Sequence, residues 1–208
     1  MTPLPASFLI AALLLPPLPA AAADDTGPGE EAAMLERVES YYNSIRSLRA
    51  RFTQNSPQGV VQGTVYLRKP GNMRVEYDPP SQILLVANGN QLVYYDGEVD
   101  QVSYVSPEET PLWLLLRNEV SFAADSIDVL DVHRTRGVIE ITVARADDPG
   151  AGQLTLVFDA DPLLFRQWRG VDPQGTETAV TLHSLQTGVS LSDALFRFQR
   201  PGNGGTRN

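Results

Sequence analysis

The hydrophobic positions of this chain change their period near residue 55. Before that point, between Glu30 and Phe52, apolar residues recur every three or four positions, which predicts one long helix over the whole segment. Gly29 stands at the expected cap position. Glu30 and Glu31 would place negative charge in the first turn, where the helix dipole favours it.

After a turn at residues 55–59, apolar and polar residues alternate, which is the pattern of half-buried antiparallel strands. Such segments recur along the rest of the chain, separated by turns rich in Pro, Gly, Asn and Asp. The predicted strands are 61–68, 73–77, 83–87, 92–95, 99–105, 127–132, 138–144, 153–158, 164–169 and 178–185. They follow one another in hairpin order without alternating helices, which favours an antiparallel sheet over a parallel one.

A short helical segment is predicted at residues 106–117, between two of these strands. Thr110 is the expected cap, and Pro111 suits the first turn. Trp113 and the leucines around it make the segment apolar on nearly every side, so it cannot be an ordinary surface helix. The elements together predict mainly β structure with α: a large antiparallel sheet, curled into an open barrel and covered by helices.

The first 23 residues carry no charge and contain an apolar run, Phe8 to Leu15, of the length found in signal peptides. Ala21 and Ala23 fit the small-residue cleavage pattern, although no Lys or Arg precedes the run. We therefore expect a signal peptide cleaved after about Ala23 and an exported protein. The expected organisation is a signal peptide at 1–23, a flexible leader at 24–29, one domain at 30–200 and a disordered tail at 201–208.

Composition and charge narrow the possible functions. The chain has no cysteine, which excludes a disulfide framework, a thiolate metal site and a lipidated N-terminal cysteine. No stretch after residue 23 is long and apolar enough to cross a membrane, so we expect the mature chain to be free in solution. Its net charge of −9 disfavours nucleic acid and anionic membrane surfaces as partners.

Residues typical of catalysis or metal binding are sparse. His133 and His183 are far apart in strand-like segments, and neither has an obvious third ligand. Asp147 and Asp148 fall in a turn, and no common nucleotide-binding, zinc-protease or serine-hydrolase motif occurs. We therefore predict no enzyme, no metal site and no cofactor.

Apolar residues concentrate on one predicted strand face and in the segment 106–117. A well-filled core explains this concentration, and the periodicity alone favours that interpretation. A lined cavity is the alternative, because helices that lie across a concave sheet can enclose apolar space for a ligand.

Several segments occur in a familiar order: Tyr42 to Gln54, Gly63 to Tyr77 with its basic-Pro-Gly turn, Asn88-Gly89, Tyr95-Asp96, Gln101-Val102, Thr110-Pro111 and Phe196-Arg197-Phe198. This ordered set resembles the LolA-type outer-membrane lipoprotein carriers over nearly the whole mature chain. The resemblance implies an incomplete antiparallel barrel with a helical lid that encloses a hydrophobic cavity. It also implies a monomeric periplasmic carrier without a cofactor, which accepts acylated lipoproteins from an inner-membrane ABC transporter complex of the Lol type and passes them to an outer-membrane receptor lipoprotein.

The resemblance also directs attention to particular residues. The expected cavity and lid residues are Val65, Leu67, Met73, Val75, Leu112, Trp113, Leu115 and Leu116. Lys69 is the candidate lid latch, at a position where the family has an Arg that hydrogen-bonds lid carbonyls; a lysine lacks the planar fork of arginine. Val75 stands where relatives usually have Trp, and the segment from Pro201 makes a further C-terminal strand doubtful.

Two other functions stay open at this point. The first is a carrier or sensor of another lipid or glycolipid on the same fold. The second is a periplasmic hydrolase with an unrecognised site, which a cleft containing clustered titratable residues would favour.

Overall fold

The computed structural model describes residues 27–89 and 91–201. Its strands are β1 (Ser47–Ser56), β2 (Gly59–Arg68), β3 (Asn72–Tyr77), β4 (Ile83–Asn88), β5 (Leu92–Asp96), β6 (Gln101–Val105), β7 (Ile127–Arg134), β8 (Val138–Arg145), β9 (Gln153–Ala160), β10 (Leu163–Val171) and β11 (Glu177–Thr187). The predicted strands are all present at similar bounds. The predicted signal peptide, the first half of the leader and nearly all of the tail lie outside the described residues.

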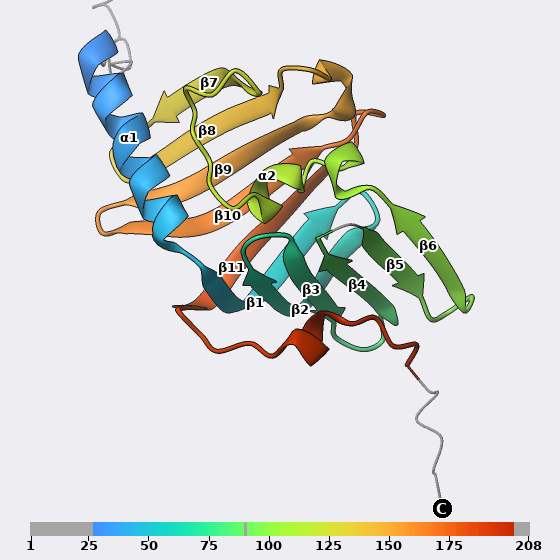
Figure 1. Ribbon diagram of the computed structural model, residues 1–208. Helices are drawn as coiled ribbons and strands as arrows, with labels where there is room; N and C mark the ends of the chain where they lie inside the picture. The colour runs from blue at the N-terminus through green and yellow to red at the C-terminus, as the bar shows by residue number, and fades with distance from the viewer. Residues whose placement is uncertain (1–26, 90, 202–208) are drawn as a thin grey trace, which may run out of the picture.

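The strands form one sheet of eleven, in the order β6-β5-β4-β3-β2-β1-β11-β10-β9-β8-β7. Every described pairing is antiparallel. Pairing of β1 with β11 joins the two halves of the chain, and β6 and β7 are the two free ends, so the sheet is open (Figure 1). The expected large antiparallel sheet is therefore present.

The predicted first helix is too long. Helix α1 spans Pro28–Ser44, whereas the remainder of the predicted helix belongs to β1. In β1, Leu48, Ala50 and Phe52 are buried and alternate with exposed arginines, so the side chains follow a strand period. Pairing with β2 on one side and β11 on the other satisfies the backbone of β1 and overrides the helical spacing.

The ends of α1 differ in part from the prediction. Its N-cap is Gly27 rather than Gly29, and no side chain caps it. Glu30 and Glu31 do lie in the first turn, as expected from the helix dipole. The helix ends where Ile45 becomes extended, with its N–H still donating to the carbonyl of Tyr42 at 3.2 Å.

Residues 106–117, here called the crossing segment, lie over the same face of the sheet as α1 (Figure 1). They hold a 3-10 turn, η1 (Pro107–Glu109), and one helical turn, α2 (Trp113–Leu116), rather than a continuous helix. Thr110 does not cap α2, because its hydroxyl donates to the carbonyl of Pro107 at 2.8 Å and closes η1 instead.

The main core lies between the sheet and these two covering elements. Tyr42 of α1 packs edge-on against Phe165 of β10, with ring centres 5.5 Å apart. Asn43 donates to the carbonyl of Val120 at 2.7 Å and accepts from its N–H at 2.9 Å, so α1 is tied to the chain just after the crossing segment.

The opposite face carries a smaller core, which the C-terminal segment covers. After β11 the chain forms η3 (Asp193–Phe196) and passes beneath the sheet as seen in Figure 1. Phe198 packs there with Tyr95 of β5 and Leu84 of β4. Arg68 anchors the segment by a 2.7 Å ion pair with Asp193.

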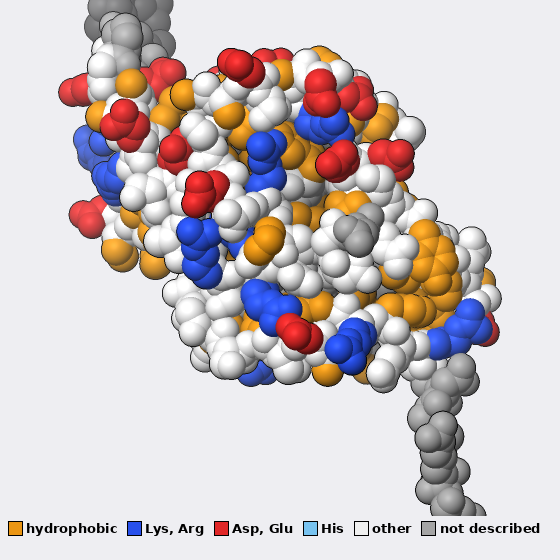
Figure 2. Space-filling view, in the orientation of Figure 1, with side chains coloured by type: hydrophobic (Ala, Val, Ile, Leu, Met, Phe, Trp, Pro, Cys, Tyr) orange, Lys and Arg blue, Asp and Glu red, His pale blue; other side chains and the backbone are white. Residues whose placement is uncertain are grey.

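The remaining surface is mixed in character. Tyr104 of edge strand β6 is 63% exposed, and Figure 2 shows a hydrophobic patch over the β5 and β6 region.

His133 and His183 are exposed strand residues. Among the residues that the structure describes, no three His, Cys, Asp or Glu side chains are grouped so that they could hold a metal ion. No described helix has the length and apolarity needed to span a bilayer.

Candidate functional site

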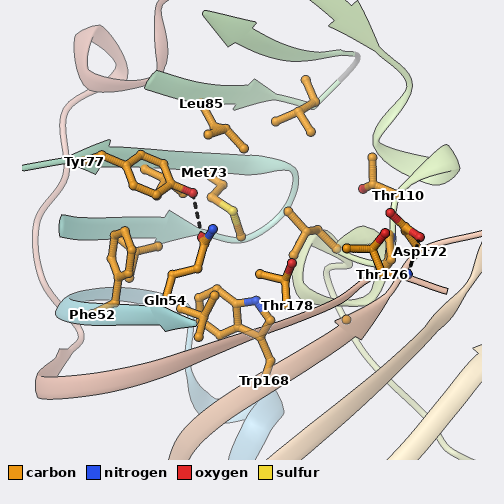
Figure 3. Close-up of a pocket in the computed structure, with 17 residues that line it drawn as sticks. Phe52, Gln54, Met73, Tyr77, Leu85, Thr110, Trp168, Asp172, Thr176 and Thr178 are labelled. Carbon is orange, nitrogen blue, oxygen red and sulfur yellow. Dashed lines mark hydrogen bonds between the residues drawn. The ribbon is translucent and has the colours of Figure 1, made fainter. Parts of the chain in front are cut away.

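A pocket of about 300 Å³ lies between the two halves of the sheet (Figure 3). One wall comes from β2 and β3, where Val65 pairs directly with Val75 and Leu67 with Met73. Paired residues share a face of the sheet, so these four side chains all point to the covered side. The local alternation of small or apolar with polar residues is thus what builds this wall.

The facing wall comes from β10 and β11. Trp168 and Val180 line it, with Thr178 beside them. Trp168 stacks on Phe165, with ring centres 6.1 Å apart and planes inclined by 18°, which fixes the orientation of the indole.

One end of the pocket is formed by Phe52 and Tyr77, whose rings meet edge to face at 5.3 Å. Gly63, which pairs with Phe52 across β1 and β2, makes this possible, because a Cβ on Gly63 would lie 2.6 Å from the Phe52 ring. The Tyr77 hydroxyl donates to Gln54 Oε1 at 2.7 Å, and burial raises the pKa of Tyr77 to about 12. The Tyr77 hydroxyl and the Gln54 carbonyl oxygen are therefore hydrogen-bonded to each other within the apolar wall.

The crossing segment borders the pocket through Thr110, Pro111 and Leu112. Pro111 packs against β10 at Gly170, where an added Cβ would lie 3.3 Å from the proline ring. This close approach places the segment directly over the gap between the two halves of the sheet.

Polar contacts hold the crossing segment near both of its ends. The Gly71 N–H, in the turn between β2 and β3, donates to the carbonyl of Leu116 at 2.8 Å. At the other end, Arg145 of β8 donates through Nη1 to the carbonyl of Glu108 at 2.8 Å. Arg145 is itself oriented by two hydrogen bonds to the Asp147 carboxylate, at 2.6 and 3.0 Å.

The predicted cavity residues fall into three groups. Val65, Met73, Val75 and Leu112 line the pocket. Leu67 and Leu115 border a gap of only about 10 Å³ beneath it, among Tyr42, Phe165 and Trp168, so they are packed core residues. Trp113 and Leu116 border a separate, more polar hollow of about 630 Å³ together with Arg117 and Arg145.

Lys69, the predicted latch, is only 8% exposed. Its Nζ donates to the carbonyl of Tyr42 at 3.0 Å and lies 3.6 Å from the centre of the Tyr42 ring. Burial, with a smaller contribution from the charge of Arg46, lowers the pKa of Lys69 to about 8. Lys69 therefore contacts the last turn of α1, whereas the turn that follows it contacts the crossing segment through the backbone of Gly71.

Several pocket residues were not predicted. Phe52 and Gln54 were missed because β1 was taken for helix, although the alternation around Phe52 could have indicated their face. Trp168, Val180 and the polar residues Thr110, Asp172, Thr176 and Thr178 also line the pocket. Their membership depends on the pairing of β1 with β11, which no local pattern in the sequence indicates.

Fold and site together define an open β-sheet protein with an apolar internal pocket. Residues 43–199 match the family model described as outer membrane lipoprotein carrier protein LolA, and the chain belongs to this family. The resemblance seen in the sequence is thereby confirmed.

Individual relatives are similar over most of the chain. An outer-membrane lipoprotein carrier protein of Methylococcus capsulatus is 28% identical over 182 residues, covering 82% of this chain and 86% of the relative. An uncharacterized protein of Rickettsia prowazekii is 26% identical over 168 residues, covering 80% and 77%. The solved structure of an uncharacterized conserved protein from Thermus thermophilus superposes with a TM-score of 0.48 at 11% identity, covering 82% of this chain and 96% of that one.

Proposed function

We propose that this protein is a periplasmic carrier that binds the acyl chains of lipoproteins released from the inner membrane and delivers them to the outer membrane. Membership of the family supports the carrier role. The observation that carries the proposal is the pocket of about 300 Å³, whose walls are mainly hydrocarbon side chains and which the crossing segment borders. In this proposal the crossing segment is the lid.

The energies are compatible with loading by lid movement. Burying an acyl chain of about fifteen methylenes gains about 12 kcal/mol, since each contributes about 0.8 kcal/mol. Lifting the segment breaks the Gly71–Leu116 and Arg145–Glu108 hydrogen bonds, each worth about 1 kcal/mol. It also exposes the four buried side chains of α2 (Trp113–Leu116), at about 2 kcal/mol each. The acyl chain can therefore offset these losses.

The size of the pocket indicates that it must widen for a multiply acylated cargo. A volume of about 300 Å³ lies at the lower end of the range of ligand pockets, which is about 300–1,000 Å³.

Lys69 anchors α1 rather than the lid in this scheme, and Gly71 takes the latch position. The donor of cargo is an inner-membrane ABC transporter complex of the Lol type, and the acceptor is an outer-membrane receptor lipoprotein.

Leu112 provides a direct test, because it is a half-buried lid residue that lines the pocket. Purified mature protein is incubated with vesicles that hold a triacylated lipoprotein, the cognate transporter and ATP, and the soluble complex is then quantified. We expect Leu112→Glu to abolish the complex, because the glutamate places charge against the acyl chains. The thermal unfolding midpoint of the free variant should stay near that of the wild type.

The matched control is Leu164→Glu, the same substitution on β10 at a side chain that is 43% exposed and outside the pocket. This variant should load like wild type. Failure of the wild-type protein to form a soluble complex would overturn the carrier proposal. Equal loading by Leu112→Glu would show that the acyl chains do not occupy this pocket.

A further inference from the structure

The polar side chains that line the pocket are not evenly distributed. Phe52 and Tyr77 lie at one end, whereas Thr110, Asp172 and Thr176 lie together at the other (Figure 3). The first end is aromatic, and its hydroxyl is already hydrogen-bonded to Gln54. A bound chain with a polar end group would therefore find its polar partners at the second end.

Asp172 is fixed in place at this end by the turn between β10 and β11. Its Oδ1 accepts from the backbone N–H of Gln174 at 2.9 Å and of Thr176 at 2.8 Å. Its own N–H donates to the carbonyl of Thr176 at 3.1 Å. The half-buried carboxylate is therefore held at the pocket and cannot swing away to accommodate a ligand.

The carboxylate has no cationic neighbour in the pocket wall. Among the seventeen described residues that line the pocket, none is Lys, Arg or His. The nearby hollow does contain Arg145, but that side chain is bonded to Asp147 and to the lid carbonyl of Glu108. An anionic end group would meet a like charge without compensation, in a partly desolvated site where repulsion is stronger than in water.

An uncharged end group meets a favourable arrangement at the same place. The threonine hydroxyls donate and accept hydrogen bonds, so they can donate to an ester or amide carbonyl. The Asp172 carboxylate accepts from an amide N–H or an alcohol. Acyl chains attached to a lipid-modified protein terminate in such ester and amide groups, whereas a free fatty acid ends in a negatively charged carboxylate.

We propose that the pocket selects acyl chains held as uncharged esters or amides and rejects chains with an anionic end group, and that Asp172 causes the rejection. The inference rests on the proposed function, since it assumes that acyl chains enter this pocket. It adds a basis on which a carrier would avoid free fatty acids.

The test compares two ligands with the same chain: monopalmitoylglycerol, which is uncharged, and palmitate at pH 8. Binding below the micelle concentration is followed by tryptophan fluorescence, to which Trp168 contributes from the pocket wall. Salt at about 1 M shortens the Debye length to about 3 Å, which removes the contribution of the overall charge of −9. We expect the wild type to bind the ester at least tenfold more tightly, a difference of about 1.4 kcal/mol.

Asp172→Asn is the decisive variant, because its amide oxygen keeps the acceptor for the turn while the charge is removed. We expect it to bind palmitate more tightly and thereby to reduce the preference for the ester to less than threefold. Asp128→Asn, at an exposed position on edge strand β7, makes the same change in net charge away from the pocket and should keep the wild-type preference.

The outcomes separate the two proposals. Equal wild-type affinity for both ligands would overturn the selectivity while leaving acyl binding intact. A preference that persists in Asp172→Asn would overturn the role of Asp172. Absence of binding for both ligands in every variant would count against the carrier function itself.

Discussion

The buried Lys69 predicts how the stability of this protein responds to alkaline pH. Burial lowers its pKa from 10.5 to about 8 in the folded protein. Between these two values the folded state binds fewer protons than the unfolded state, so the free energy of unfolding rises with pH across the window. Below pH 8 both states are protonated, and the full cost of burying the charge is present.

The magnitude follows from the size of the pKa change. Within this window each pH unit changes the free energy of unfolding by about 1.4 kcal/mol. Lys69 should therefore add about 2 kcal/mol of stability between pH 8 and about 9.5. Lys69→Met removes this contribution. The Tyr42 carbonyl still accepts from the Ile45 N–H at 3.2 Å, so the substitution leaves no unsatisfied acceptor there. We expect Lys69→Met to be within about 1 kcal/mol of wild type at pH 7.

Urea unfolding at a series of pH values, followed by the fluorescence of buried Trp113 and Trp168, measures the effect. Burial raises the pKa of Tyr42 and Tyr77, which lowers stability as the pH rises above about 10. Subtracting the Lys69→Met curve from the wild-type curve cancels this tyrosine contribution. Parallel curves for wild type and Lys69→Met would refute the reasoning, because they would mean that the Lys69 ammonium is solvated in the folded protein.

Three further substitutions test the packing of the crossing segment. Gly71→Ala should lower the free energy of unfolding by about 1–3 kcal/mol, because Gly71 has φ +74° and its added Cβ would lie 2.6 Å from Gly89 Cα. Arg145→Ala should leave global stability within about 1 kcal/mol but speed hydrogen exchange around Glu108, since the side chain holds that carbonyl. Leu115→Ala should cost about 2–5 kcal/mol in urea unfolding, because this residue of the crossing segment is only 2% exposed.

Matched controls make these expectations specific. Gly137→Ala introduces a Cβ into open space and should leave urea unfolding unchanged. Leu112→Ala, at a half-buried position of the crossing segment, should cost clearly less stability than Leu115→Ala. Arg166→Ala removes the ion pair from β10 to Asp159 of β9 and should not change hydrogen exchange in the crossing segment. A reversed order of the two leucine variants would mean that Leu115, not Leu112, faces the pocket.

The strands of the sheet were predictable because alternation is a local property. From Met73 to Tyr77, for example, each inward residue is followed by an outward polar one, and Pro or Gly marks the turns on either side. The same information indicated hairpin order and therefore antiparallel pairing. It also identified Val65, Met73 and Val75 as one face, which is the face that lines the pocket.

The boundary between α1 and β1 could not be decided in this way. Leu48 and Phe52 are four residues apart, a spacing that fits both a helical turn and two steps along one face of a strand. Hydrogen bonds from β2 and β11 decide that this segment is a strand. β2 follows β1 directly in the sequence, whereas β11 lies more than a hundred residues away.

By itself, the sequence determined the strands other than β1, their turns and the family to which the chain belongs. Tertiary structure alone decided which apolar residues line a pocket and which fill the core, because pairing of β1 with β11 brings Trp168 and Asp172 opposite Val75. It also decided the partner of Lys69, since a buried ammonium binds whichever carbonyl the packing of α1 presents, here that of Tyr42.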